Sequence, residues 1–139
     1  MSMAPAWARV TAMDGQPRIV IADRSELAAN MYRLLLAPLG ATLILRRRFE
    51  EARPHFFRRE GVRLGVFNSN IFGKKFMEIV QRLIEDEPLR KASKLFICRE
   101  VPAEEPWRER LAAIPNAKVI TRPFHPDEFA ALVKRLVAP

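Results

Sequence analysis

The stretch RIVIADRSELAANMYRLLLAPLGATLIL, residues Arg18 to Leu45, decides the fold of this chain. It begins with the apolar run Arg18–Ala22, whose β-branched residues predict a buried strand. A helix is expected to follow over Ser25–Gly40, because Ser25 can cap the first turn and a proline and a glycine end the pattern. Ala41–Leu45 predicts a second strand, so the stretch is one strand–helix–strand unit. The apolar side chains expected on the buried face of this helix are Leu27, Met31, Leu34 and Leu35.

The same alternation continues to the end of the chain. Further strands are predicted at Val62–Phe67, Ser93–Cys98 and Ala117–Thr121. Helices are predicted over residues 49–60, 72–88, 104–114 and 125–137, with Pro54 weakening the first and Pro88 ending the second. Phe76, Ile79, Val80 and Leu83 share one helical face of the second.

Strands that alternate with helices predict a parallel sheet covered on both faces. We therefore expect an α/β fold of the flavodoxin-like type, a (βα)5 three-layer sandwich with strand order 2-1-3-4-5. Sites in such sheets form beyond the carboxyl ends of the strands. The residues expected there are Asp23, Arg24, Arg46, Asn68, Cys98, Arg99 and Arg122.

The chain has 139 residues, 49% of them hydrophobic and 29% charged, which suits one globular domain. We expect a flexible N-terminal tail over residues 1–17, with Trp7 able to dock on the body, and one domain over residues 18–139. One cysteine excludes an internal disulfide, and no apolar run is long enough for a membrane span or a secretory signal. A cytoplasmic protein with no membrane partner is therefore expected.

The net charge is +8, from 24 Lys and Arg against 16 Asp and Glu. Such a balance attracts nucleic acid, anionic lipid or an acidic protein. An equally open interpretation is a solvated surface in a chain that favours arginine.

Residues 18–137 resemble the receiver domain of bacterial two-component response regulators. The opening RIVIADRSELAANMYRLLLAPLGA resembles the strand and paired acids of a receiver, and VITRPFHPDEFAALVKRL resembles its Lys-Pro-Phe ending and last helix. The spacings also fit, with 45 residues from Asp23 to Asn68 and 54 from Asn68 to Arg122.

The resemblance implies a site that accepts a phosphoryl group on an aspartate, with two more acids for Mg²⁺, a lysine and a Ser or Thr. Asn68 stands at the position of that aspartate, and Arg24 replaces the second acid beside Asp23. Arg122 replaces the lysine, and the Ser or Thr position falls at Cys98 or Arg99. A carboxamide cannot form an acyl phosphate, and one acid among these cations gives Mg²⁺ little to bind. We predict a degenerate receiver, a pseudo-receiver, with no metal site, no cofactor and no aspartyl phosphorylation.

Several residues in this pocket allow two interpretations. The Asn68 amide either imitates a fixed signalling state or satisfies backbone groups nearby. Arg122 either binds an anion or forms an ion pair with Asp23. Cys98 is either redox-active or an inert buried thiol. A cationic rim at this edge either binds an anion or is merely solvated, and its expected members are Arg24, Arg46, Arg47, Arg48, Lys74, Lys75 and Arg122.

The sequence favours a non-enzymatic signalling adaptor that works through protein–protein contacts, with a signalling protein or with a second copy. By resemblance, the partner face is the fourth helix, fifth strand and fifth helix, about Glu104–Val137, with Trp107, Phe124 and Lys134 on it. For Trp107, packing in the core is the alternative. The alternative function is an anion or nucleic-acid binding module that uses the cationic rim. A third hypothesis is phosphorylation at Ser69.

Overall fold

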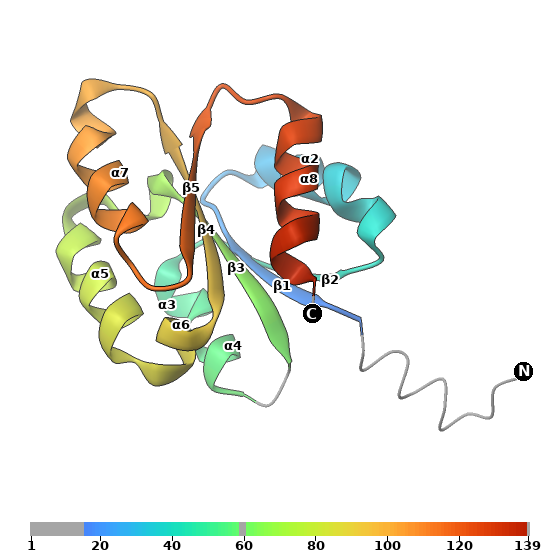
Figure 1. Ribbon diagram of the computed structural model, residues 1–139, viewed down its shortest axis with the longest axis horizontal. Helices are drawn as coiled ribbons and strands as arrows, with labels where there is room; N and C mark the ends of the chain where they lie inside the picture. Colours follow the sequence, from blue (N-terminus) through green and yellow to red (C-terminus); the bar gives the residue numbers. More distant parts are fainter. Residues whose placement is uncertain (1–15, 59–60, 139) are drawn as a thin grey trace, which may run out of the picture.

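The computed structural model describes residues 16–58 and 61–138, and these form one sheet with helices on both faces (Figure 1). Its five strands are all parallel and follow the order β2-β1-β3-β4-β5. Their bounds are β1 Arg18–Ala22, β2 Thr42–Arg46, β3 Val62–Asn68, β4 Ser93–Arg99 and β5 Ala117–Arg122. The predicted flavodoxin-like fold and strand order are confirmed. Trp7 and the rest of residues 1–15 lie outside the described residues.

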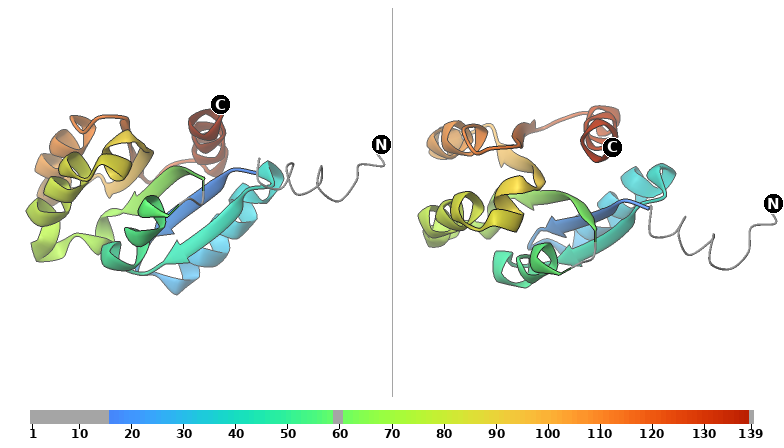
Figure 2. Two further views of the ribbon diagram at one scale, coloured as in Figure 1. Left: turned by 90° about the horizontal axis from the view of Figure 1, so that it is seen from below. Right: turned by 60° about the horizontal axis from the view of Figure 1, so that its bottom comes forward.

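Two helices cover one face of the sheet, and the remaining helices cover the other (Figures 1 and 2). On the first face lie α2 Glu26–Leu36 and α8 Pro126–Val137. On the second lie α3 Phe49–Ala52, α4 Pro54–Phe57, α5 Phe76–Glu85, α6 Glu87–Lys91 and α7 Glu105–Ala112. Short 3-10 turns at Ala37–Leu39, Ser69–Ile71, Gly73–Lys75 and Pro102–Glu104 complete the connections.

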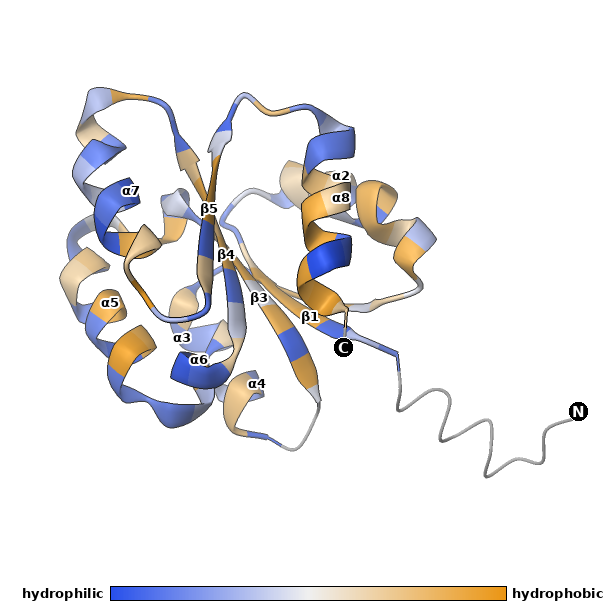
Figure 3. Ribbon diagram, in the orientation of Figure 1, coloured by the Kyte–Doolittle hydropathy of each residue, from blue (hydrophilic) through white to orange (hydrophobic). Residues whose placement is uncertain are grey.

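The core divides into two halves because alternate residues of each strand point to opposite faces. Ile19 and Ile21 of β1 pack toward α2 and α8, whereas Val20 and Ala22 pack toward α3 to α7. In Figure 3 the apolar colouring follows the central strands, while α7 is mostly hydrophilic.

Proline positions explain how the predicted helices divide. Where one helix was predicted from residue 49, two short helices form over residues 49–57, and Pro54 occupies the first position of α4, where its missing N–H costs nothing. Residues 76–85 form α5, with Phe76, Ile79, Val80 and Leu83 buried as predicted. The predicted end at Pro88 is wrong, because α5 ends before Asp86 and Pro88 lies inside the first turn of α6.

The predicted buried face of α2 is wrong by about one residue. Leu27 is 84% exposed and Leu34 78% exposed, whereas Tyr32 and Leu36 are each 1% exposed. Met31 is also exposed and Leu35 half-buried. The stripe through Tyr32 and Leu36 has the same helical spacing, and it brings the Tyr32 hydroxyl against Asp23.

Within residues 16–58 and 61–138, every helix is too short or too polar to cross a membrane.

Candidate functional site

The Asp23 carboxylate, just after β1, is the centre of a buried polar network and is only 6% exposed. Its Oδ1 accepts hydrogen bonds from the backbone N–H of Ser25 at 2.8 Å and from Asn70 Nδ2 at 2.7 Å. Its Oδ2 accepts from the Tyr32 hydroxyl and from Asn68 Nδ2, both at 2.7 Å. All four donors are neutral, so dipoles rather than a counter-ion stabilise this buried charge.

Asn68, at the end of β3, donates to a side chain and not to backbone groups. The interpretation in which it satisfies neighbouring backbone groups is therefore wrong. Only the amide nitrogen can face the Asp23 carboxylate, because the amide oxygen would repel it. That orientation leaves Asn68 Oδ1 buried, with no hydrogen-bond partner among the described residues.

Tyr32 and Asn70 are the members of this network that sequence reasoning missed. Burial raises the pKa of the Tyr32 phenol, and the charge of Asp23 raises it further, so Tyr32 stays a donor. Asn70 connects two loops, because its Oδ1 accepts the Arg24 backbone N–H at 3.2 Å while its Nδ2 reaches Asp23. The signals were present: Asn70 ends the strand pattern beside Asn68, and Tyr32 is the chain's single tyrosine.

The two arginines expected in the pocket do not neutralise Asp23. Arg122, the last residue of β5, makes no ion pair with Asp23 in the described part of the chain, so the interpretation of an Arg122–Asp23 pair is wrong. The neutral donors already occupy both carboxylate oxygens. The Nε of Arg122 is buried and has no hydrogen-bond partner among the described residues, and the charge of Arg122 acts on Tyr32 and Cys98. Arg24 is exposed, and it lines a separate hollow that does not include Asp23.

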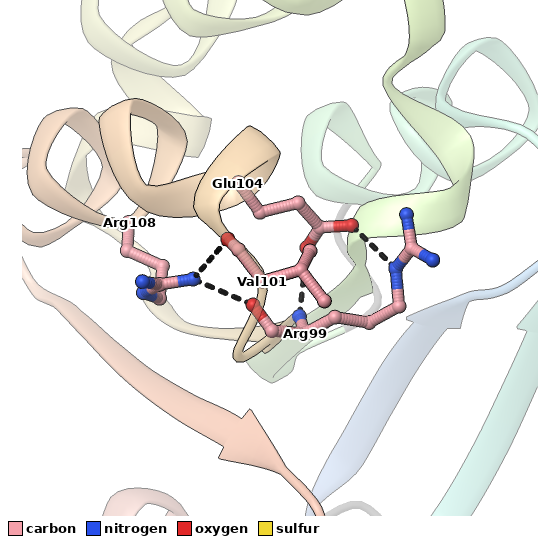
Figure 4. Close-up of polar contacts among 4 residues, drawn as sticks. All are labelled: Arg99, Val101, Glu104 and Arg108. Atoms are coloured by element: carbon pink, nitrogen blue, oxygen red, sulfur yellow. Dashed lines mark hydrogen bonds and ion pairs between the residues drawn. The ribbon is translucent and has the colours of Figure 1, made fainter.

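A second polar cluster lies at the turn after β4 (Figure 4). Glu104 is 3% exposed and accepts hydrogen bonds from the Arg99 backbone N–H at 2.7 Å and from Arg99 Nε at 2.8 Å. Burial acts to raise the pKa of Glu104, but the hydrogen bonds from Arg99 and the Ser69 hydroxyl hold it below its usual range. Arg108 donates to the backbone oxygens of Arg99 and Val101, at 2.6 Å and 3.2 Å. The cluster fixes the loop that follows β4.

Cys98 and Ser69 are both buried, and neither presents a reactive group to solvent. Cys98 is 0% exposed, and burial raises the pKa of its thiol to about 11. The thiol is therefore protonated at neutral pH, which supports the interpretation of an inert buried residue. Ser69 is 3% exposed, and its hydroxyl contributes to the lowered pKa of Glu104.

The expected cationic rim divides between two sides of the sheet edge. Arg46 lines a hollow together with Asp23, Tyr32 and Arg47, and it donates to the Leu45 backbone oxygen at 2.8 Å. It does not line the hollow that the other rim residues share, so its place in the rim stays a prediction. The structure brings the others together in one hollow, which Arg122 does not line: Arg24, Arg47, Arg48, Lys74 and Lys75.

The three residues expected on the partner face differ in exposure. Trp107 is half-buried and stacks on Phe76 with ring centroids 5.0 Å apart, so its packing is that of a core residue. Phe124 is half-buried and stacks on Phe129 at 5.3 Å. Lys134 of α8 is exposed.

The residues of this pocket do not fit Mg²⁺, the ion that the receiver resemblance implies. Asp23 is its one carboxylate, and both oxygens already accept two hydrogen bonds each. In the part of the chain that the structure describes, no three His, Cys, Asp or Glu side chains gather as a metal site. An octahedral ion needs several oxygen ligands, and binding it here would break this network.

No protein-family model matches the sequence, and no curated protein does either. Solved structures do match. A response regulator from Thermotoga maritima is 19% identical, with a TM-score of 0.67 over 89% of this chain and 99% of the other. A CheY-like receiver domain protein from Methanospirillum hungatei JF-1 is 17% identical, with a TM-score of 0.68 over 88% and 94%. The chemotaxis response regulator CheY4 of Vibrio cholerae is 14% identical, with a TM-score of 0.69 over 87% and 98%. At these identities the likeness shows that the fold is that of receiver domains.

Proposed function

We propose that this chain is a signalling adaptor with a receiver fold, which takes no part in phosphoryl transfer and acts by binding other proteins or a second copy of itself. One observation carries the proposal. The Asp23 carboxylate is saturated by four neutral donors, and one of them is the amide of Asn68, at the position of a phosphoacceptor.

Phosphoryl transfer would need a nucleophile at this position, and the carboxamide of Asn68 is not one. Its nitrogen is also committed to Asp23 at 2.7 Å. Transfer further depends on neutralising charge around a metal ion, and this pocket offers one carboxylate that is already hydrogen-bonded. The Asp23 network therefore provides neither the nucleophile nor the metal ion that phosphoryl transfer requires.

Ser69 does not replace the missing aspartate in this proposal. The residue is 3% exposed, so a phosphoryl donor reaches its hydroxyl only if the surrounding structure opens. A phosphate there would also lie against the buried carboxylate of Glu104, which repels it.

Signalling by contact remains possible in this arrangement, because nothing in it depends on a change of charge. The face that the resemblance implies, α7, β5 and α8, still offers the exposed Lys134 and the half-buried Phe124. Trp107 is not free to bind a partner as an interface anchor, because its ring packs against Phe72 and Phe76.

A phosphoryl challenge tests the proposal. The protein is incubated with Mg²⁺ and acetyl phosphate, its intact mass is measured, and its amide spectrum is recorded with and without beryllofluoride. A phosphorylatable receiver run in parallel shows that the reagents work. We expect no added phosphoryl mass and no Mg²⁺-dependent shift at Asp23, Asn68 or Arg122. A stoichiometric mass gain, or a saturable shift that needs Mg²⁺, would overturn the proposal.

A further inference from the structure

A hollow of about 340 Å³ opens at the carboxyl edge of the sheet, and Asp23 is not among its lining residues. We call it the basic hollow, and its lining residues are Arg24, Arg47, Arg48, Glu50, Ile71, Phe72, Gly73, Lys74 and Lys75. A second hollow of the same volume shares Arg24, Arg47 and Arg48 with it and adds Glu51. Asp23 lines neither of them, so its charge does not face a ligand there.

Three of the five cations in the basic hollow form no ion pair within 4 Å among the residues that the structure describes. Arg47 pairs with Glu26 at 3.2 Å and Lys75 with Glu50 at 3.0 Å, both on the surface. Within residues 16–58 and 61–138, Arg24, Arg48 and Lys74 form no ion pair. The hollow therefore keeps a surplus of positive charge that its own acids do not cancel.

The strand order places these cations around a crevice. Arg24 follows β1, and Arg47 and Arg48 come directly after Arg46, the last residue of β2. Lys74 and Lys75 lie in the 3-10 turn Gly73–Lys75 after β3. In a sheet of order 2-1-3-4-5, the connections from β1 and β3 leave on opposite faces, and ligands bind in the crevice outside the carboxyl ends there.

The lining also restricts the chemistry of the ligand. Arginine and lysine bind phosphate oxygens well, and the arginine fork can bind two at once. Binding of nucleic-acid bases requires exposed aromatic rings, but Phe72, the aromatic residue of the hollow, is 2% exposed. Cations from three loops suit several phosphoryl groups in a row better than a single one.

We propose that the basic hollow binds a phosphate chain of two or more phosphoryl groups, through the side chains of Arg24, Arg48 and Lys74. The chain is bound without a metal ion and without any part of the Asp23 network. This inference goes beyond the adaptor function and does not depend on it.

Calorimetric titration with inorganic pyrophosphate, at fixed ionic strength and without Mg²⁺, tests the proposal. We expect saturable binding that Arg24→Gln combined with Arg48→Gln weakens by about 100-fold, since each of the two lost charged hydrogen bonds costs about tenfold or more in affinity. The matched control is Arg110→Gln with Arg135→Gln, which removes the same charge from exposed sites on α7 and α8. This control is expected to bind almost as tightly as the unmodified chain.

Further titrations identify the source of the phosphate chain. A nucleoside diphosphate that binds no more tightly than pyrophosphate supports recognition of the phosphate chain alone. Two results would overturn the proposal: no saturable binding of pyrophosphate, or an equal loss in both double variants, which would show general attraction to a chain of charge +8. Tighter binding of a single-stranded oligonucleotide with a steep salt dependence in both variants would do so too. None of these results needs Mg²⁺ or Asn68, so they leave the phosphoryl challenge as a separate test.

Discussion

The hydrogen bond from Asn68 to Asp23 shows why one atom changes the chemistry of this pocket. An aspartate at residue 68 would bring a second carboxylate against the first, and such a pair is stable only with cations or protons between them. The amide replaces that repulsion with an N–H donor at 2.7 Å. The sequence alone shows that residue 68 carries an amide and not a carboxylate, but the partner of the amide follows only from the distance between β1 and β3.

Asn68→Asp is expected to destabilise the protein by about 3 kcal/mol at pH 7, because two adjacent carboxylates raise the pKa of the pair by about two units or more. When folding raises the pKa of a carboxyl group, the free energy of unfolding falls as the pH rises from the unfolded pKa to the folded pKa. The loss should therefore shrink as the pH falls toward 4. Urea unfolding at several pH values measures this change.

The control for this experiment is Asn68→Leu, which removes the same donor without adding a charge. Its loss of stability is expected to be the same at pH 5 and pH 7. If Asn68→Asp also loses the same amount at both pH values, the two side chains do not share a site.

At the scale of the helix, α2 shows how a polar contact selects one of two apolar faces. The stripe through Leu27, Met31 and Leu34 is as regular as the stripe through Tyr32 and Leu36. Hydrophobic spacing favours neither, because each would bury large side chains. Only the second places a hydroxyl within 2.7 Å of the Asp23 carboxylate. A rule based on apolar periodicity alone could not predict this rotation.

Two leucines of α2 test the orientation directly. Leu36→Ala is expected to cost about 2–5 kcal/mol, because the residue is buried and the change opens a cavity. Leu34→Ala, on the exposed face, should stay within about 0.5 kcal/mol of the unmodified protein. Chemical denaturation measures both free energies of unfolding, and equal losses would contradict the orientation.

The end of α6 depends on a buried lysine that the apolar pattern of β4 conceals. Lys94 is 0% exposed, and its Nζ donates to the backbone oxygens of Leu89, Arg90 and Ala92 at 2.6, 3.2 and 2.6 Å. Three acceptors match the three N–H donors of an ammonium group. Burial lowers the pKa of Lys94 to about 8, so the charged form still predominates at neutral pH.

Lys94→Met should alter how stability depends on pH. Between pH 8 and the unfolded pKa near 10.5, the folded protein releases the Lys94 proton while the unfolded chain keeps it. Stability from this group therefore rises with pH in that window, by up to about 1.4 kcal/mol per pH unit. The free energy of unfolding of the unmodified protein minus that of Lys94→Met should therefore increase from pH 7.5 to pH 10 in denaturation experiments.

Lys118→Met, at an exposed site on β5, is the matched control for this change. The difference in free energy of unfolding between Lys118→Met and the unmodified protein should be independent of pH over the same range. A constant gap for Lys94→Met would show that the ammonium group is not buried in solution.

At the scale of the whole molecule, the fold was predictable and the site only in part. The strands were predicted within about two residues, because each is a short apolar run between charged or turn residues. The polar contacts were not, because Asp23, Tyr32 and Asn70 come from three separate segments and meet only in the folded chain. Composition gave the surplus of positive charge, but only the strand order shows which cations share a hollow.

The saturated Asp23 carboxylate has a consequence for timing, if the chain acts as proposed. A receiver that is switched covalently stores a message for as long as its acyl phosphate survives hydrolysis. This pocket has no such store, since its one acid keeps the same four partners before and after any encounter. The duration of a signal would equal the residence time of the complex, and its strength would follow the number of copies in the cell. Such a protein would signal its present concentration and would keep no record of past stimuli.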